Sequence, residues 1–175
     1  CVNDDDCARR AATGFGTSKL VPRTHHFTTG IQSVLKNNEE FNTANMVNIA
    51  YCSGDSWLGR SNEPNAYGLT MNGGLIVDAV LEELINKHDL LSATNIIFSG
   101  KSAGGVGLVA QIDRWADTIA QAFEAQGYSA KLQPPKVSAI AYAGFHYFHT
   151  HTFYDPRDQM SIGENKNSDD DSKDA

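Results

Sequence analysis

The residues best suited to chemistry are a serine and its two flanking glycines, in the pattern G-x-S-x-G from Gly100 to Gly104. An apolar run typical of a buried strand precedes them at residues 96–98, and a helical pattern follows. Strand, tight turn and helix are the context of a nucleophile elbow, in which Ser102 projects from the end of a sheet. The glycines avoid a collision in that turn, and the N–H of Ala103 points at a developing oxyanion. The pattern predicts acyl transfer with Ser102 as the nucleophile.

The same pentapeptide also fits a glycine-rich turn whose serine only caps the following helix. The local sequence leaves both interpretations open. They differ in the backbone of Ser102, because a nucleophile elbow requires an outlier conformation between a strand and a helix N-terminus.

The elements that must position this serine alternate along the chain. Strands are predicted at residues 46–52, 95–100 and 137–143, and helices at residues 73–88 and 105–126. This order predicts parallel β-α-β units and an α/β sheet with helices on both faces.

Both predicted helices carry apolar residues at three- and four-residue spacing, which indicates one buried face on each. Gly127 is a stop signal for the second helix. Trp115 falls on the buried stripe of that helix, so we expect it in the core. The expected inward residues are Val77, Val80, Leu81, Leu84 and Ile85 in the first helix, and Val109, Ile112, Trp115, Ile119 and Phe123 in the second.

Composition is that of a soluble globular protein, with 41% hydrophobic and 20% charged residues. The net charge of −7 argues against a nucleic-acid partner or an anionic membrane surface. No apolar run approaches the roughly 20 residues of a membrane span. Residues 155–175 are polar and acidic, and we expect them to be disordered because they offer almost no apolar surface.

Three cysteines, Cys1, Cys7 and Cys52, leave at least one thiol without a partner in the chain. Cys1 and Cys7 bracket the short, largely polar segment VNDDD, which favours a disulfide-closed loop over a zinc site, because no second ligand pair has suitable spacing. A disulfide implies an oxidising compartment. No metal site is predicted.

Other polar and aromatic residues are weaker candidates for a site. Asp55 and Trp57 share a Gly/Ser/Asn-rich loop and could line a substrate pocket, although packing in the core is the simpler interpretation for Trp57. The adjacent histidines at 25–26 are left unassigned. The histidines at 146, 149 and 151 could supply a catalytic base or a metal ligand, but a solvated or core role is favoured, and Asp155 or Asp158 is a weaker candidate for an orienting acid.

Four blocks of sequence together resemble the pectin acetylesterase and Notum family of carboxylesterases. They are the cysteine-bracketed loop CVNDDDC, the segment ANMVNIAYCSGDSWLG at residues 44–59, the segment GLIVDAVLEELI followed by the elbow GKSAGGVG, and the short motif QIDR at residues 111–114. The resemblance covers about residues 1–148. It also matches Cys1 and Cys7 to a small loop of the family, and it implies a partner for Cys52 upstream of Cys1.

The resemblance implies a parallel-sheet, doubly wound α/β-hydrolase-like fold, of which residues 1–154 form a part. It also implies hydrolysis of a carboxylic ester by a Ser-His-Asp triad without a cofactor. Ser102 matches the nucleophile and Ala103 the oxyanion donor. We expect the triad histidine and aspartate, and a second oxyanion loop, to lie outside these 175 residues. Where the family carries Asp in an A-D-x-G block, this chain has Tyr142.

Two functions follow as hypotheses. The first is a secreted serine carboxylesterase that removes acetyl groups from a pectin-type polysaccharide of the cell wall or a fatty acyl group from a protein. The second is a catalytically incomplete fragment or relative that binds carbohydrate or protein without turnover.

Overall fold

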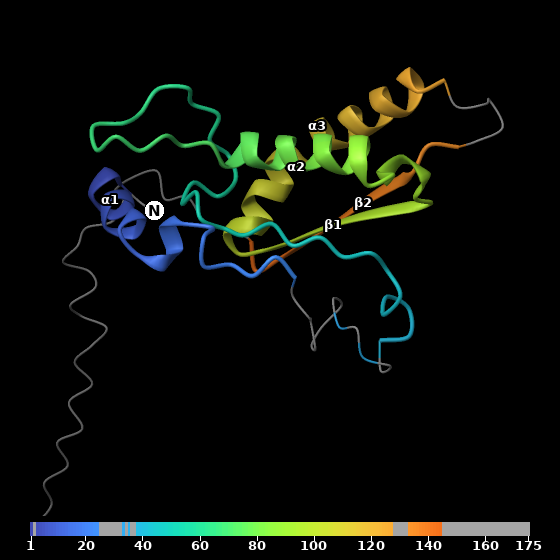
Figure 1. Cartoon of the computed structure of the whole chain (residues 1–175), viewed down its shortest axis with the longest axis horizontal. Coiled ribbons are helices and arrows are strands. Elements are labelled where there is room, and N and C mark those ends of the chain that lie inside the picture. Colours follow the sequence, from blue (N-terminus) through green and yellow to red (C-terminus); the bar gives the residue numbers. More distant parts are fainter. Residues whose placement is uncertain (2, 25–32, 34, 36–37, 128–132, 145–175) are drawn as a thin grey trace, which may run out of the picture. The chain divides into compact units, whose positions relative to one another are not determined.

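Two parallel strands and the helix between them form the centre of the described structure, which is a computed structural model (Figure 1). Residues 1, 3–24, 33, 35, 38–127 and 133–144 are described. Strand β1 (Asn95–Lys101) leads into helix α3 (Ala103–Ala125), and the chain returns as strand β2 (Lys136–Tyr142). The strands pair in parallel from Asn95 opposite Lys136 to Lys101 opposite Tyr142. This α/β unit with a parallel sheet confirms the predicted fold class.

Helix α2 (Gly73–Lys87) matches its predicted bounds to within one residue. Its N-terminus is satisfied by the loop before it, because Gly73 N donates to an Asp55 carboxylate oxygen at 2.7 Å and Gly74 N donates to Gly59 O at 2.8 Å. Helix α3 ends as predicted, with Gly127 in the left-handed region at φ 64° and its N–H bonded to Glu124 O.

A short helix, α1 (Asp4–Ala11), lies near the start of the chain. In the described residues, the 3-10 turn η1 (Gly14–Gly16) follows α1, and the 3-10 turn η3 (Leu90–Ser92) follows α2. The Asn3 side chain caps α1 by accepting a hydrogen bond from Asp6 N at 2.9 Å. Three aspartates in its first turn and two arginines in its last turn suit the helix dipole. Local sequence therefore accounts for this helix.

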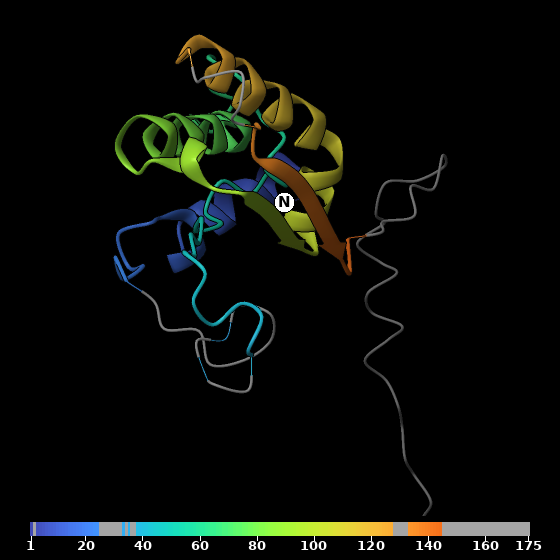
Figure 2. The same ribbon diagram turned by 90° about the vertical axis from the view of Figure 1, so that its right-hand side faces the viewer.

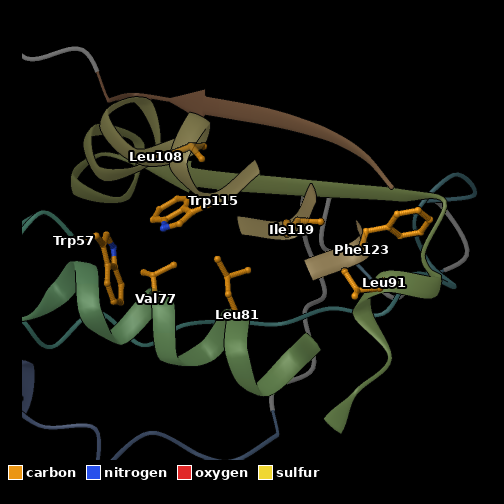
Figure 3. Close-up of a cluster of buried hydrophobic side chains, with 8 residues drawn as sticks. All are labelled: Trp57, Val77, Leu81, Leu91, Leu108, Trp115, Ile119 and Phe123. Carbon is orange, nitrogen blue, oxygen red and sulfur yellow. The ribbon is translucent and has the colours of Figure 1, made fainter. Parts of the chain in front are cut away.

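The core lies between α2, α3 and one face of the sheet (Figure 3). Phe98 of β1 stacks on Trp115 with ring centroids 5.4 Å apart, and Ile96 and Val137 pack against the same cluster. Burying a side chain as completely as Ile119, which is 1% exposed, contributes about 2 kcal/mol. The eight buried members are Trp57, Val77, Leu81, Leu91, Leu108, Trp115, Ile119 and Phe123.

Both longer helices lie on the same side of the sheet in the described residues, not on both faces as predicted (Figure 2). Helix α3 packs on both strands, and α2 packs on α3. On the opposite face of the sheet, Ile97, Ile140 and Tyr142 are each at least 40% exposed. The described elements therefore cover one face of the sheet.

The strand predicted at residues 46–52 is not present, because within the described residues β1 and β2 pair only with each other. A strand needs a neighbour for its hydrogen-bond ladder, and this segment has none there. Ile49 and Tyr51 pack on the core, whereas Val47 is 51% exposed, although all three residues would share one face of a strand.

The inward face of α3 also differs from the prediction. Val109 is 70% exposed, and Leu108 and Gln111 are buried in its place. Helix α3 is turned this way because Gly107 meets the backbone of the loop that contains Ser56, where a Cβ would lie 2.4 Å from Ser56 O. That contact fixes the rotation of α3 about its axis. The polar residue Gln111 therefore lies in the buried stripe.

No helix in the part of the chain that the structure describes is both long and apolar enough to cross a membrane. The tail predicted to be disordered, residues 155–175, lies outside the described residues, as do the histidines at 25–26, 146, 149 and 151.

Candidate active site

Ser102 lies at the junction of β1 and α3, directly after the last residue of the strand. Its backbone has φ 52° and ψ −118°, an outlier for a residue with a side chain and the conformation predicted for an elbow. The backbone is held from two sides, since its N–H donates to Tyr142 O and its carbonyl accepts from Val106 N, both at 3.1 Å. The side chain is exposed and makes no capping hydrogen bond to α3, which contradicts the helix-cap interpretation.

Gly100 is required by a close backbone approach at this junction. A Cβ on Gly100 would lie 2.3 Å from Gly104 O and 2.5 Å from its carbonyl carbon. The predicted collision at Gly104 is absent, because a Cβ there would meet only Trp57 Nε1 at 3.8 Å. The second crowded position is Gly105, whose Cβ would lie 3.0 Å from the Cα of Gly144, just past β2. Sequence reasoning missed this contact because it joins segments about forty residues apart.

Ala103 is the first residue of α3. The first amide groups of a helix have no partner within the helix, and the helix dipole makes that end favourable for negative charge. A carbonyl oxygen that gained charge beside Ser102 would therefore meet a suitably polarised donor. The geometry suits the oxyanion role that was predicted for Ala103.

Trp57 lies beside the first turn of α3, as its contact with the Gly104 position shows. It is 8% exposed and packs against Tyr51 with ring centroids 5.2 Å apart, so the core interpretation describes most of its surface (Figure 3). Trp57 and the preceding Ser56 both have left-handed backbones, at φ 63° and 55°. Two consecutive residues with side chains in this region form a strained turn close to the elbow.

Asp55 holds that turn from within the loop. Its Oδ1 accepts from Ser53 Oγ at 2.6 Å and from Trp57 N at 3.1 Å. Its Oδ2 accepts from Gly59 N at 3.1 Å and from Gly73 N at 2.7 Å. Four hydrogen bonds make this carboxylate the organiser of the loop and the cap of α2, a role that the sequence alone did not predict.

The predicted disulfide between Cys1 and Cys7 is present, with Cα atoms 5.1 Å apart, and Cys52 is a free, half-buried thiol. A cavity of about 140 Å³ lies next to the disulfide and is lined in part by Arg10, Cys52 and Met71. No residue of the elbow lines it. In the described ranges, no three His, Cys, Asp or Glu side chains come together to hold a metal ion.

The described residues include one histidine, His88, which ends α2. It precedes the start of β1, whereas Ser102 follows its end, and a strand of this length spans about 20 Å. His88 is therefore at the wrong end of the strand to act as a base for Ser102. The other candidate bases, and Asp155 and Asp158, lie outside the described residues.

Comparison with known proteins identifies the family of this chain. Residues 1–152 match the model of the pectinacetylesterase family. The chain belongs to that family.

Relatives in the family come from animals and plants. The chain is 35% identical over 130 residues to mouse palmitoleoyl-protein carboxylesterase NOTUM and 34% identical over 132 residues to the human protein, covering 73% and 74% of this chain. It is 28% identical over 121 residues to pectin acetylesterase 11 of Arabidopsis thaliana, covering 68% of this chain. These alignments span 25%, 26% and 30% of the relatives, so the chain spans about a quarter of their length.

Tyr142, which stands where the family resemblance predicted Asp, serves the elbow through its backbone. Its carbonyl accepts the Ser102 N–H, and its side chain is 46% exposed on the opposite face of the sheet from α3. The structural support for Ser102 therefore does not depend on which side chain occupies this pectinacetylesterase position.

Proposed function

We propose that the protein is a carboxylic ester hydrolase in which Ser102 is the nucleophile. The observation that carries the proposal is the exposed serine in a left-handed backbone between β1 and α3, free of any capping hydrogen bond. A helix cap does not need this strain, whereas an elbow does, because the strain directs the hydroxyl away from the helix.

In the proposed reaction, Ser102 Oγ attacks the acyl carbonyl and the Ala103 N–H stabilises the oxyanion. A histidine oriented by an aspartate accepts the serine proton and returns it to the leaving alcohol. The histidine and the aspartate belong outside the described residues. The acyl-serine is then hydrolysed by water, so no cofactor is needed.

The substrate proposal rests on the names of the relatives, which are a palmitoleoyl-protein carboxylesterase and a pectin acetylesterase. The substrate proposed for this protein is an acylated protein or an acetylated pectin-type polysaccharide. The Cys1–Cys7 disulfide supports a secreted or secretory-pathway location, because such bonds persist in oxidising compartments.

A second candidate is a family member that binds acylated carbohydrate or protein without hydrolysing it. Neither candidate requires a histidine near Ser102 among the described residues, so turnover separates the two.

The test is hydrolysis of p-nitrophenyl acetate and butyrate by the full-length gene product, its Ser102→Ala variant and the 175-residue chain. We expect Ser102→Ala to abolish turnover of the full-length product. The 175-residue chain should be nearly as slow as its own Ser102→Ala variant, since loss of the base leaves only the catalysis that binding and the oxyanion donor supply. Ser102-independent turnover by the full-length product would refute the nucleophile. Rapid Ser102-dependent turnover by the 175-residue chain would instead place the base among His146, His149 and His151.

A further inference from the structure

Gln111, in the QIDR segment, is a polar residue in the buried stripe of α3, with 8% of its surface exposed. Its Nε2 donates to the carbonyl oxygen of Trp57 at 2.8 Å, across 54 residues of sequence. Its Oε1 accepts two hydrogen bonds from Arg114, one helical turn later, at 3.0 Å from Nε and 2.7 Å from a terminal nitrogen. A buried amide is stabilising only if both of its ends are satisfied, and here both are.

The contacts continue from Arg114 across the interface between the helices. A terminal nitrogen of Arg114 lies 2.7 Å from Asp78 of α2, and the other oxygen of Asp78 lies 2.6 Å from Arg60. Partial burial raises the pKa of Asp78. The guanidinium groups of Arg114 and Arg60 together lower it by more than burial raises it, so the pKa is below its usual value. The carboxylate is therefore charged at neutral pH and bridges two arginines.

The two ends of this series of contacts return to the same loop. Arg60 lies three residues after Trp57, so the path from Trp57 through Gln111, Arg114 and Asp78 to Arg60 is a closed ring of polar contacts. We call these four side chains, Gln111, Arg114, Asp78 and Arg60, the polar clamp. A closed ring restricts the loop more than a single contact, because the loop cannot shift without breaking one of the bonds.

The turn that the polar clamp holds is strained and touches α3 near the elbow. Ser56 and Trp57 both have positive φ, and Gly107 lets the helix approach the Ser56 carbonyl closely. The Trp57 indole then lies beside Gly104, two residues after Ser102. Strain of this kind persists only where the surroundings determine the conformation, and Gln111 binds the backbone at the strained residue itself.

We propose that Gln111 is a positioning residue that, through the polar clamp, fixes the Trp57 indole at a set distance from the Ser102 elbow. The indole then forms one wall beside the acyl group that Ser102 carries. The role of the indole as a wall of the acyl site rests on the proposed function. The polar clamp itself does not depend on turnover.

The structural test is ¹⁹F NMR of the 175-residue chain labelled with 5-fluorotryptophan. The chain has two tryptophans, so Trp57→Phe assigns both resonances. Gln111→Glu keeps the acceptor for Arg114 but removes the donor to the Trp57 carbonyl. We expect the Trp57 resonance to shift or broaden and the Trp115 resonance to stay in place. Arg60→Gln, at a half-exposed position at the far end of the clamp, should move the Trp57 resonance less.

The matched control is Lys87→Gln, which breaks an exposed ion pair with Glu83 on α2 and should move neither resonance. An unchanged Trp57 resonance in Gln111→Glu, or equal movement of both tryptophans, would overturn the proposal. If Gln111→Glu does not fold, Arg60→Gln decides, because a folded variant with an unmoved Trp57 resonance refutes the clamp.

The catalytic test is the response of KM to acyl length in the full-length gene product. A loosened Trp57 wall weakens contacts with the acyl chain that are equally strong in the ground state and the transition state. Gln111→Glu should therefore raise KM for p-nitrophenyl butyrate about threefold or more, with kcat within about twofold. The rise should be smaller for p-nitrophenyl acetate. A fall in kcat with KM unchanged would contradict a positioning role. If Ser102→Ala leaves turnover intact while the Trp57 resonance still moves, the proposed function fails and the clamp stands.

Discussion

The elbow at Ser102 and the turn at Ser56–Trp57 hold side-chain-bearing residues in the same left-handed region by different means. The elbow is enforced by sterics, since Gly100 permits a backbone approach that any Cβ would block. The Trp57 turn is enforced by polar side chains, with Asp55 bonding its N–H and Gln111 its carbonyl. A steric constraint fails when an atom is added, and a polar one fails when an atom is removed. The two regions should therefore respond to opposite kinds of substitution.

Gly100→Ala should have the largest effect, because its Cβ would lie 2.3 Å from backbone that cannot rotate away. We expect a loss of about 3 kcal/mol in the free energy of unfolding, at the upper end of overpacking effects. The matched control is Gly104→Ala, which has room and sits in a helix, so it should stabilise by about 0.5 kcal/mol. Urea denaturation measures both. Equal losses at the two glycines would show that the elbow is not enforced by this contact.

Asp55→Ala should follow, with a loss of about 2 kcal/mol, because it removes the cap of α2 and leaves several loop donors unbonded. The variant should also make Trp57 more accessible to acrylamide quenching while Trp115 stays protected. Asp55→Asn keeps the acceptor oxygen and should lose less. A fully stable Asp55→Ala protein would mean that the turn is held by α3 alone.

Reduction of the Cys1–Cys7 disulfide should cost about 2 kcal/mol, given the short loop it closes. The effect should be largest in α1 and at Gly54, whose carbonyl oxygen accepts from the Cys1 amino group, because the disulfide makes no contact with the elbow. Hydrogen exchange should speed up in α1 and not in β1 or α3. Thiol titration of the denatured, unreduced protein should find one free cysteine, and a count of three would refute the pairing.

Acid should produce the smallest effect, and it should act on the polar clamp through Asp78. The pKa of Asp78 is lowered in the folded state, so its contribution to stability is complete above the unfolded value of about 4. That contribution is lost as the pH falls through the folded pKa. The stability difference between the parent and Asp78→Asn should therefore shrink below about pH 4 in urea titrations at low salt, which do not screen the ion pairs. A difference that stays constant from pH 6 to pH 3 would show that the ion pairs add nothing.

The sequence predicted those features that depend on local spacing. Helix α2 has a regular apolar stripe and was placed to within one residue, and the strand–serine–helix order followed from the motif. Contacts between distant segments were not predictable in this way. The exposure of Val109 follows from the meeting of Gly107 and Ser56, some fifty residues apart, and the crowding at Gly105 follows from Gly144.

The roles of polar side chains were the hardest to predict. Asp55 was considered for a pocket, and it binds four loop and helix donors, because the loop folds back around it. Gln111 is polar and was not expected in the inward stripe, yet its partner is the Trp57 carbonyl. Neither partner can be read from spacing, since backbone acceptors and donors carry no sequence signal.

Covalent labelling can show whether Ser102 is the nucleophile. The full-length gene product would be treated with a fluorophosphonate, digested, and its adduct located by mass spectrometry. If Ser102 is the nucleophile, we expect one rapid adduct, on Ser102, that is absent from Ser102→Ala and from the denatured protein and that appears in step with loss of esterase activity. Loss of activity with the adduct on another residue, and Ser102 unmodified, would contradict the assignment of Ser102 as the nucleophile.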